Sequence, residues 1–143
     1  GVYGYDVNMA AMMRDLVQFG PMAVAIEAPP TLGAYKSGVF SPGKDNRKKE
    51  TRKGKHSYFQ KTNHAVTLIG FGVAKDQKGN IKYDKDGSPT LTWKIRNSWG
   101  ENWGDNGNFE IERGIDIIAS ETMPLAVRFT AGSSSKKGKA YIE

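Results

Sequence analysis

Only two histidines occur among the 143 residues, and one of them, His64, lies in a setting that suggests a chemical role. It opens an apolar run, HAVTLIGFGV, so its imidazole is expected at the end of a strand. An imidazole can take up and release a proton near neutral pH, which suits general acid–base catalysis. A histidine at a strand edge is, by itself, more often structural than catalytic. The other histidine, His56, lies in a basic stretch and is expected to be solvated.

A second motif favours the catalytic interpretation of His64. Residues 97–100 read NSWG and residues 101–104 read ENWG, so two tryptophans stand four residues apart and each precedes a glycine. The motif directly follows a strand candidate, TWKIR. A tight turn with aromatic anchors would explain part of this pattern, but burial alone does not explain both tryptophan–glycine pairs.

The composition limits the chemistry that these residues can perform alone. There is no cysteine, which excludes a disulfide, a zinc–thiolate site and a thiol nucleophile within the chain. We predict no metal site, because DKDG at 84–87 resembles a calcium loop only faintly and the later ligands are absent. No apolar run approaches the roughly 18–20 residues of a membrane span, so we expect a soluble protein. The chain begins with Gly1 and shows neither an initiating Met nor a leader, which suggests a processed piece of a longer protein.

The net charge of +6 is concentrated in two segments. Residues 44–61 read KDNRKKETRKGKHSYFQK, and SSSKKGK lies near the C-terminus. A basic patch could bind an anionic partner, but stretches with few interleaved aromatic residues and no nucleic-acid fold rarely bind specifically. We therefore expect a solvated loop that is open to proteolysis, a flexible tail over 132–143, and no specific nucleic-acid binding.

The remaining sequence predicts one helix followed by strands. Helical spacing of apolar residues predicts a helix over 6–19, which Gly20-Pro21 ends. Turn residues over 75–90 predict an extended hairpin. This order indicates an α+β fold dominated by an antiparallel sheet or an open barrel. The expected strands cover 22–28, 64–73, 91–96, 107–113 and 125–130.

Taken together, NHAVTLIGFG and WKIRNSWGENWGDNGNFEIERG resemble the C-terminal half of a papain-like cysteine protease, over about residues 2–127. In that family N-H-A-V supplies the catalytic histidine and N-S-W-G the asparagine that orients it. The resemblance implies that His64 activates a cysteine thiol as a base and then protonates the leaving amine. It implies that Asn97 orients the imidazole without adding a charge that would compete with the thiolate. Trp99 would cover their hydrogen bond and exclude water.

The resemblance also implies an architecture and substrate contacts. Residues 1–131 would form the C-terminal antiparallel β-barrel half of a papain-like α+β domain, with one N-terminal helix and insertions at about 43–61 and 75–90. The helical half that carries the cysteine would be on another chain. Asn63 would offer its backbone to the substrate. Ala25 and Ala65 would line the pocket for the second residue on the acyl side, with Met123 near its floor, although simple core packing explains Ala25 equally well.

Within the family, GPMAVAIEA and ASETMPLAV are most similar to the dipeptidyl peptidase I (cathepsin C) group, while YKSGVF also suits the cathepsin B group. The first likeness implies a dipeptidyl aminopeptidase subunit that acts on peptides and proteins with free N-termini. Its partners would be the Cys-bearing chain and an exclusion domain of the same precursor, in an oligomer within a lysosome or another acidic or secretory compartment. A chloride ion near the second subsite is implied, although no residue here requires it, and no other cofactor is expected.

Some features depart from the family pattern and leave alternatives open. Thr92 stands where an aromatic residue often precedes the tryptophan, and Ile117-Ile118 replace a usual cysteine. The cathepsin C group is cut shortly before the histidine, so we expect a maturation cut within 47–61. The alternatives are a papain-like endopeptidase fragment, a degenerate inactive relative, and a noncatalytic binding module that uses the basic loop.

Overall fold

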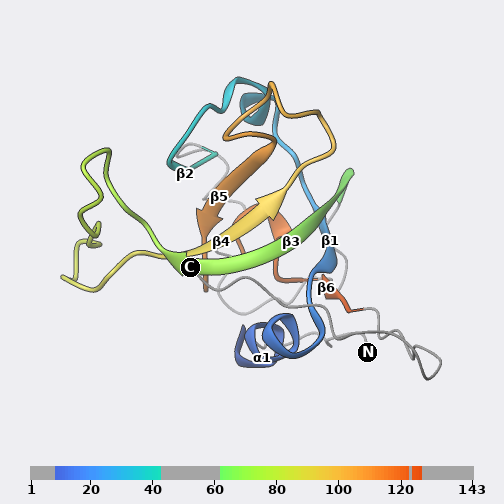
Figure 1. Ribbon diagram of the computed structural model, residues 1–143, viewed down its shortest axis with the longest axis horizontal. Coiled ribbons are helices and arrows are strands. Elements are labelled where there is room, and N and C mark those ends of the chain that lie inside the picture. Colours follow the sequence, from blue (N-terminus) through green and yellow to red (C-terminus); the bar gives the residue numbers. More distant parts are fainter. Residues whose placement is uncertain (1–8, 43–61, 123, 127–143) are drawn as a thin grey trace, which may run out of the picture.

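The computed structural model describes residues 9–42, 62–122 and 124–126, which form one α-helix, two short 3-10 helices and a single curved sheet (Figure 1). The helix α1 (Met9–Phe19) lies beneath β3 (His64–Val73) and β1 (Met22–Ile26) and buries one side that includes Met12 and Leu16. It ends where the N–H of Gly20 donates to the carbonyl of Leu16 at 3.0 Å, and Gly20 adopts the left-handed conformation (φ 92°) that favours glycine. The predicted helix is thus confirmed from residue 9 onward, and residues 6–8 lie outside the described part.

Six strands make up the sheet, in the order β2-β5-β4-β3-β1-β6. The pairs that join β5, β4, β3, β1 and β6 are antiparallel, whereas β2 pairs with β5 in parallel. The predicted strands over 22–28, 64–73, 91–96 and 107–113 are therefore present, with slightly shorter bounds in two cases. The strands are β1 (Met22–Ile26), β2 (Val39–Phe40), β3 (His64–Val73), β4 (Leu91–Arg96), β5 (Asn108–Glu112) and β6 (Pro124–Leu125).

The predicted α+β fold dominated by an antiparallel sheet is confirmed, but the sheet is not a closed barrel, so the β-barrel half that the resemblance implied is corrected to an open sheet. Closure would require β2 and β6, the two edge strands, to pair with each other, and within the described ranges each pairs only with its inner neighbour. Both strands are two residues long, and β6 begins with Pro124, which has no N–H to donate. The parallel pairing of β2 also departs from the predicted antiparallel arrangement. Residues 127–130 of the predicted strand over 125–130 lie outside the described part.

The core forms on one face of the sheet because buried and exposed residues alternate along the strands. In β1, Met22, Val24 and Ile26 are buried, while Ala23 and Ala25 face the other way. The 3-10 helix η1 (Pro30–Ala34) adds Leu32 to this core. The largest fully buried side chains from the central strands are Leu68, Trp93, Ile95, Phe109 and Ile111.

A buried carboxylate holds the connection between β5 and β6. Glu121 is only 3% exposed, and its Oε1 accepts hydrogen bonds from Trp93 Nε1 (2.7 Å) and the Gly114 N–H (2.6 Å). Its Oε2 accepts from the Asp116 N–H at 2.9 Å. The same connection includes the 3-10 helix η2 (Ile117–Ala119). The Glu121 side chain therefore links the backbone just before η2 to a core tryptophan.

Within this connection the backbone is strained. Asp116, Ile118 and Ala119 have φ of 47°, 51° and 63°, in the left-handed region that residues other than glycine adopt only at a cost. The carbonyl of Ile118 accepts a 2.8 Å hydrogen bond from the N–H of Glu27, just beyond the end of β1. The strained connection is therefore attached to the strand end that lies beside His64.

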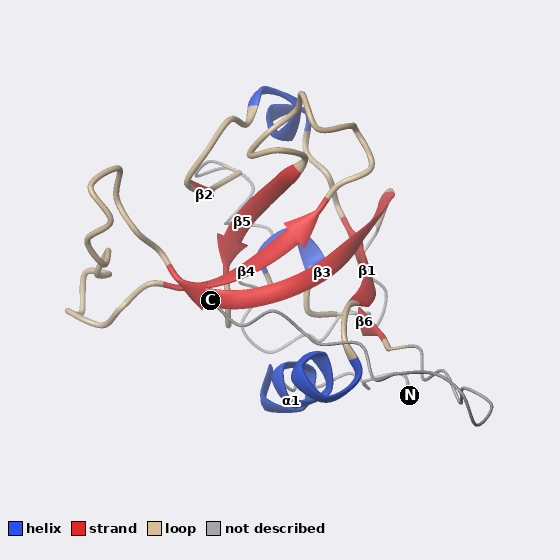
Figure 2. Cartoon of the chain, viewed as in Figure 1, coloured by secondary structure: helices blue, strands red, loops and turns tan. Residues whose placement is uncertain are grey.

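Residues 75–90 form two tandem turns in place of the predicted extended hairpin. Lys75 bridges to Ile81, and Tyr83 bridges to Pro89. Each turn contains an aspartate, Asp76 or Asp84, whose Oδ1 accepts two backbone N–H groups of its own turn. Figure 2 shows these turns projecting beyond the ends of β3 and β4, away from the sheet.

Several predicted features fall outside the described residues. They are the basic loop over 43–61 with its maturation cut, and the tail over 132–143. In the ranges that are described, the longest helix has 11 residues, and none is long and apolar enough to cross a membrane.

Candidate active site

The ends of two neighbouring strands position His64. It is the first residue of β3 and pairs with Ile26, the last residue of β1. Its side chain is half-buried, so the imidazole is anchored by the sheet and still reachable from solvent. A group held at a strand end by sheet hydrogen bonds has a well-defined position, as acid–base catalysis requires.

Asn63 fixes the chain just before the histidine. Its N–H donates to the carbonyl of Ile26 at 3.0 Å. Its side-chain amide bonds in both directions with the backbone of Ala28: Oδ1 accepts from the N–H at 2.8 Å, and Nδ2 donates to the carbonyl at 3.3 Å. The predicted backbone contact of Asn63 with a substrate would therefore use its carbonyl oxygen.

The imidazole of His64 and the carboxamide of Asn97 are in direct contact. His64 Nε2 and Asn97 Oδ1 lie 2.8 Å apart, although the residues are 33 positions apart in the sequence. The N–H of Ser98 donates to the same oxygen at 2.8 Å, which fixes the carboxamide with its oxygen toward both groups. Because that oxygen only accepts, Nε2 carries the proton of this bond. In the neutral imidazole, Nδ1 is then the nitrogen free to take a proton.

Asn97 is itself firmly held. It follows β4, is 6% exposed, and its N–H donates to the carbonyl of Gly107 at 2.9 Å. Its Nδ2 is buried and has no hydrogen-bond partner among the described residues. The side-chain orientation therefore depends on the two hydrogen bonds that Oδ1 accepts.

Trp99 covers this pair of side chains. Its ring stacks on the His64 imidazole with centroids 5.2 Å apart and an interplanar angle of 30°. Trp99 is 43% exposed, so one face lies on the imidazole and the rest meets solvent. Excluding water from one side of the His64–Asn97 hydrogen bond strengthens it, because the local dielectric falls.

Trp103 explains why a second tryptophan follows four residues later. It meets the ring of Trp99 edge-on, with centroids 4.9 Å apart. Its indole Nε1 donates to the carbonyl of Gly33 at 3.1 Å, and its ring packs against Tyr35 and Phe109, each at 5.7 Å. Trp103 thus anchors the loop to η1 and the core while Trp99 remains at the surface.

The predicted subsite alanines lie side by side on the outer face of the sheet. Ala25 and Ala65 are partners in the β1–β3 register, next to the His64 pair. Ala25 is half-buried and Ala65 is exposed, and both face away from the core. Their two methyl groups form a small apolar surface, one residue along the strands from the His64–Ile26 pair, and methyl groups alone do not bind a chloride ion. Met123, the predicted floor of this pocket, lies outside the described residues.

A groove of about 990 Å³ lies elsewhere on the molecule and does not include His64 or Asn97. Its lining includes Tyr35, Lys94 and Glu110. Burial raises the pKa of both the Tyr35 phenol and the Glu110 carboxyl. In the described ranges, no three His, Cys, Asp or Glu side chains come together as a metal site.

Comparisons with known proteins identify the family of the chain. The model of the papain family of cysteine proteases matches residues 2–127. The chain belongs to the papain family.

Two curated relatives of this papain-family chain are cathepsins. Cathepsin C of Schistosoma mansoni is 36% identical over 129 residues, which cover 90% of the chain and 24% of that protein. Mouse pro-cathepsin H is 36% identical over 108 residues, which cover 76% of the chain and 26% of that protein. The chain thus spans about a quarter of the length of these relatives.

A solved structure shows the same fold. The bromelain protease of Ananas comosus, in complex with the E64 inhibitor, superposes with a TM-score of 0.56 and 27% identity over 88% of the chain. The match covers 48% of bromelain. The open sheet and its single helix are therefore a papain-like arrangement that corresponds to about half of that protein.

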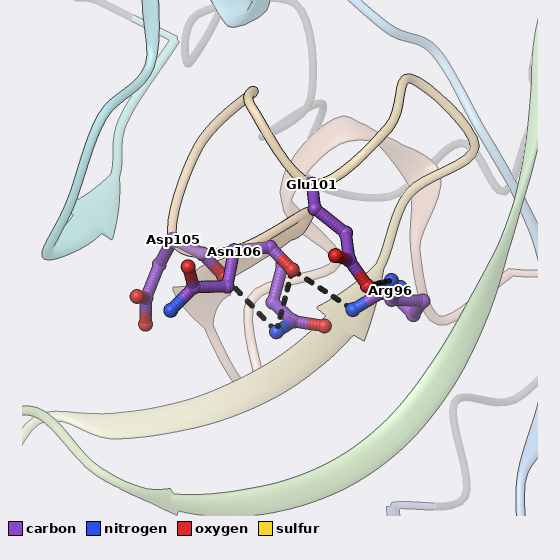
Figure 3. Close-up of polar contacts among 5 residues, drawn as sticks. Arg96, Glu101, Asp105 and Asn106 are labelled. Atoms are coloured by element: carbon purple, nitrogen blue, oxygen red, sulfur yellow. Dashed lines mark hydrogen bonds and ion pairs between the residues drawn. The ribbon is translucent and has the colours of Figure 1, made fainter.

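Arg96 is a residue of the site region that the sequence analysis missed. It precedes Asn97, and Figure 3 shows its guanidinium directed toward Glu101 and Asn106 in the loop that follows. The signal available in the sequence was a basic residue directly before NSWG, with an acidic residue five positions later.

Proposed function

We propose that this chain is the histidine- and asparagine-bearing subunit of a cysteine peptidase whose thiol is supplied by another chain of the same precursor. The observation that carries the proposal is the 2.8 Å contact between His64 Nε2 and Asn97 Oδ1 beneath Trp99. These 143 residues contain no cysteine, so the nucleophile must come from outside them. Membership of the papain family supports cysteine peptidase chemistry.

The geometry suits each proton transfer of acyl transfer from a peptide to a thiol. The thiol proton passes to His64 Nδ1, which leaves a thiolate and an imidazolium. The thiolate attacks the substrate carbonyl, and the same Nδ1–H then protonates the departing amine. Water, deprotonated by Nδ1, finally hydrolyses the thioester. Throughout these steps Nε2–H remains on Asn97 Oδ1, which keeps the imidazole in one tautomer and one orientation.

For the substrate class, we propose N-terminal dipeptides of peptides and proteins with free amines. The likeness of GPMAVAIEA and ASETMPLAV to the dipeptidyl peptidase I group supports this, as does the 36% identity to a cathepsin C over 90% of the chain. The Ala25–Ala65 surface beside His64 would contact the second residue of the dipeptide. An exclusion domain on the same precursor would hold the amine, and an acidic lysosomal or secretory compartment would be its site of action.

Hydrolysis of dipeptide–coumarin substrates by the native protein tests this proposal. We expect turnover of the substrate with a free amine and none of its N-acetylated form. Equal turnover of both forms would contradict dipeptidyl specificity and indicate an endopeptidase. Absence of turnover together with salt-sensitive binding of a polyanion would indicate the noncatalytic binding module. Replacement of His64 by Ala should abolish turnover, whereas Tyr83→Ala, at a 61% exposed turn residue, should leave it unchanged.

A further inference from the structure

The loop over residues 97–107 carries Trp99, leaves the sheet after β4 and rejoins it before β5. We call the point where its two ends meet the neck. Asn97 starts the loop at the end of β4, and its N–H donates to the carbonyl of Gly107, directly before β5. Between these two points the loop holds both Trp99 and Trp103. The position of Trp99 over the imidazole therefore depends on how firmly the neck is closed.

Arg96 reaches across this neck. Its Nη1 donates to the carbonyl of Asn106 at 2.8 Å, and its Nη2 lies 3.3 Å from Glu101 Oε1 (Figure 3). Glu101 belongs to the outgoing side of the loop, two residues after Trp99, and Asn106 to the returning side. One guanidinium thus joins both sides, which a planar group with donors in a fixed fork can do.

The neck is also packed closely around the guanidinium. Gly107 has φ of 82°, and a Cβ atom there would lie 3.2 Å from Arg96 Cζ and 3.2 Å from the carbonyl oxygen of Gly100. A side chain at position 107 would therefore crowd these two neighbours, and the positive φ also favours glycine. The side chain of Arg96 is 42% exposed and that of Glu101 is 80% exposed, so the ion pair is well solvated and weak. The main contributions of Arg96 are the hydrogen bond to Asn106 and its packing beneath the neck.

We propose that Arg96 is a positioning residue of the peptidase, which keeps Trp99 over the His64–Asn97 hydrogen bond by closing the neck of the loop. This inference rests on the proposed function. Among the described residues, the side-chain hydrogen bonds of Arg96 go to Asn106 and Glu101 rather than to His64, so in this inference it acts through Trp99 and Asn97. Its loss should slow the chemical step and leave substrate binding largely unchanged.

Three variants of the native protein test this role. In Arg96→Met the apolar stem remains and both polar contacts are lost, and we expect kcat to fall about tenfold with KM within about twofold. In Arg96→Lys one contact can re-form, and we expect a fall of about threefold. Lys85→Met removes one exposed positive charge in the tandem turns and should match the wild type. A merely structural role would change KM and kcat together or neither.

A second readout does not require turnover. The ring centroids of Trp99 and Trp103 are 4.9 Å apart, so the two indoles should give an exciton couplet in circular dichroism. The signal that is lost in Trp99→Phe gives the size of this couplet. We expect the couplet to weaken in Arg96→Met whether or not the wild type has peptidase activity. A wild type without activity would contradict the proposed function but not the role of Arg96 in placing Trp99. Wild-type kcat and couplet in Arg96→Met would overturn the inference. If Arg96→Met does not fold, wild-type kcat and couplet in Arg96→Lys would overturn it.

Discussion

Removing the buried carboxylate of Glu121 should loosen the connection between β5 and β6. Glu121→Ala leaves three donors without their acceptor: Trp93 Nε1, the Gly114 N–H and the Asp116 N–H. An unsatisfied buried donor costs about 1–3 kcal/mol, and water that enters the vacated space offsets part of the total, so we expect about 3–5 kcal/mol. Glu121→Gln keeps one oxygen and turns an NH2 group toward the third donor, so we expect about 1–3 kcal/mol.

Hydrogen exchange of the native protein measures this loss locally. The N–H groups of Ala119 and Ser120 donate to Asp116 and Ile117 and do not touch Glu121 directly, so their exchange reports opening of the connection. We expect their protection to fall about a hundredfold or more in Glu121→Ala and about tenfold in Glu121→Gln, since 1.4 kcal/mol corresponds to a factor of ten. Glu27→Gln, at an exposed carboxylate, should leave protection unchanged. Equal protection in all three variants would refute the reasoning.

Three further predictions concern the cover, the groove and the neck. Trp99→Ala should lower kcat about tenfold by exposing the His64–Asn97 bond to water, and an unchanged kcat would contradict that role. Because burial raises the pKa of Glu110, the folded protein binds this proton more tightly than the unfolded chain, so stability should fall as the pH rises from the ordinary glutamate range through the folded pKa. Thermal unfolding of Glu110→Gln should lack this decline, and an identical profile would count against it. Gly107→Ala should lower the unfolding temperature more than Gly79→Ala, because both have a left-handed φ but only Gly107 is crowded; equal losses would exclude the crowding.

The parts of the fold that local patterns determine could be predicted well. The helical spacing and Gly20-Pro21 located α1, apolar runs located β1 and β3, and β4 was among the strand candidates. The pairing of His64 with Asn97 was predicted instead from the resemblance of NHAV and NSWG to the papain-like proteases, and the structure places both residues at ends of the neighbouring strands β3 and β4. Two residues at adjacent strand ends in one sheet come together, as the 2.8 Å contact shows.

Features that depend on long-range pairing could not be predicted from local patterns. The parallel pairing of Val39 with Glu110 joins segments about 70 residues apart, and nothing in a two-residue strand specifies its partner or direction. Whether the sheet closes depends on two equally short edges. The role of Arg96 depends on the path of a loop that returns ten residues later, and turn-rich residues over 75–90 fit one hairpin as readily as two tandem turns.

The central claim is that His64, oriented by Asn97, activates a thiol on another polypeptide. The most direct measurement is covalent labelling of the native protein by a thiol-reactive epoxide probe, followed by mass analysis of each polypeptide. We predict labelling of one cysteine on a polypeptide that copurifies with this chain, and labelling at least a hundredfold slower in a folded His64→Ala variant. Labelling of that cysteine at the wild-type rate without the imidazole, or no reactive cysteine in the native protein, would contradict the account.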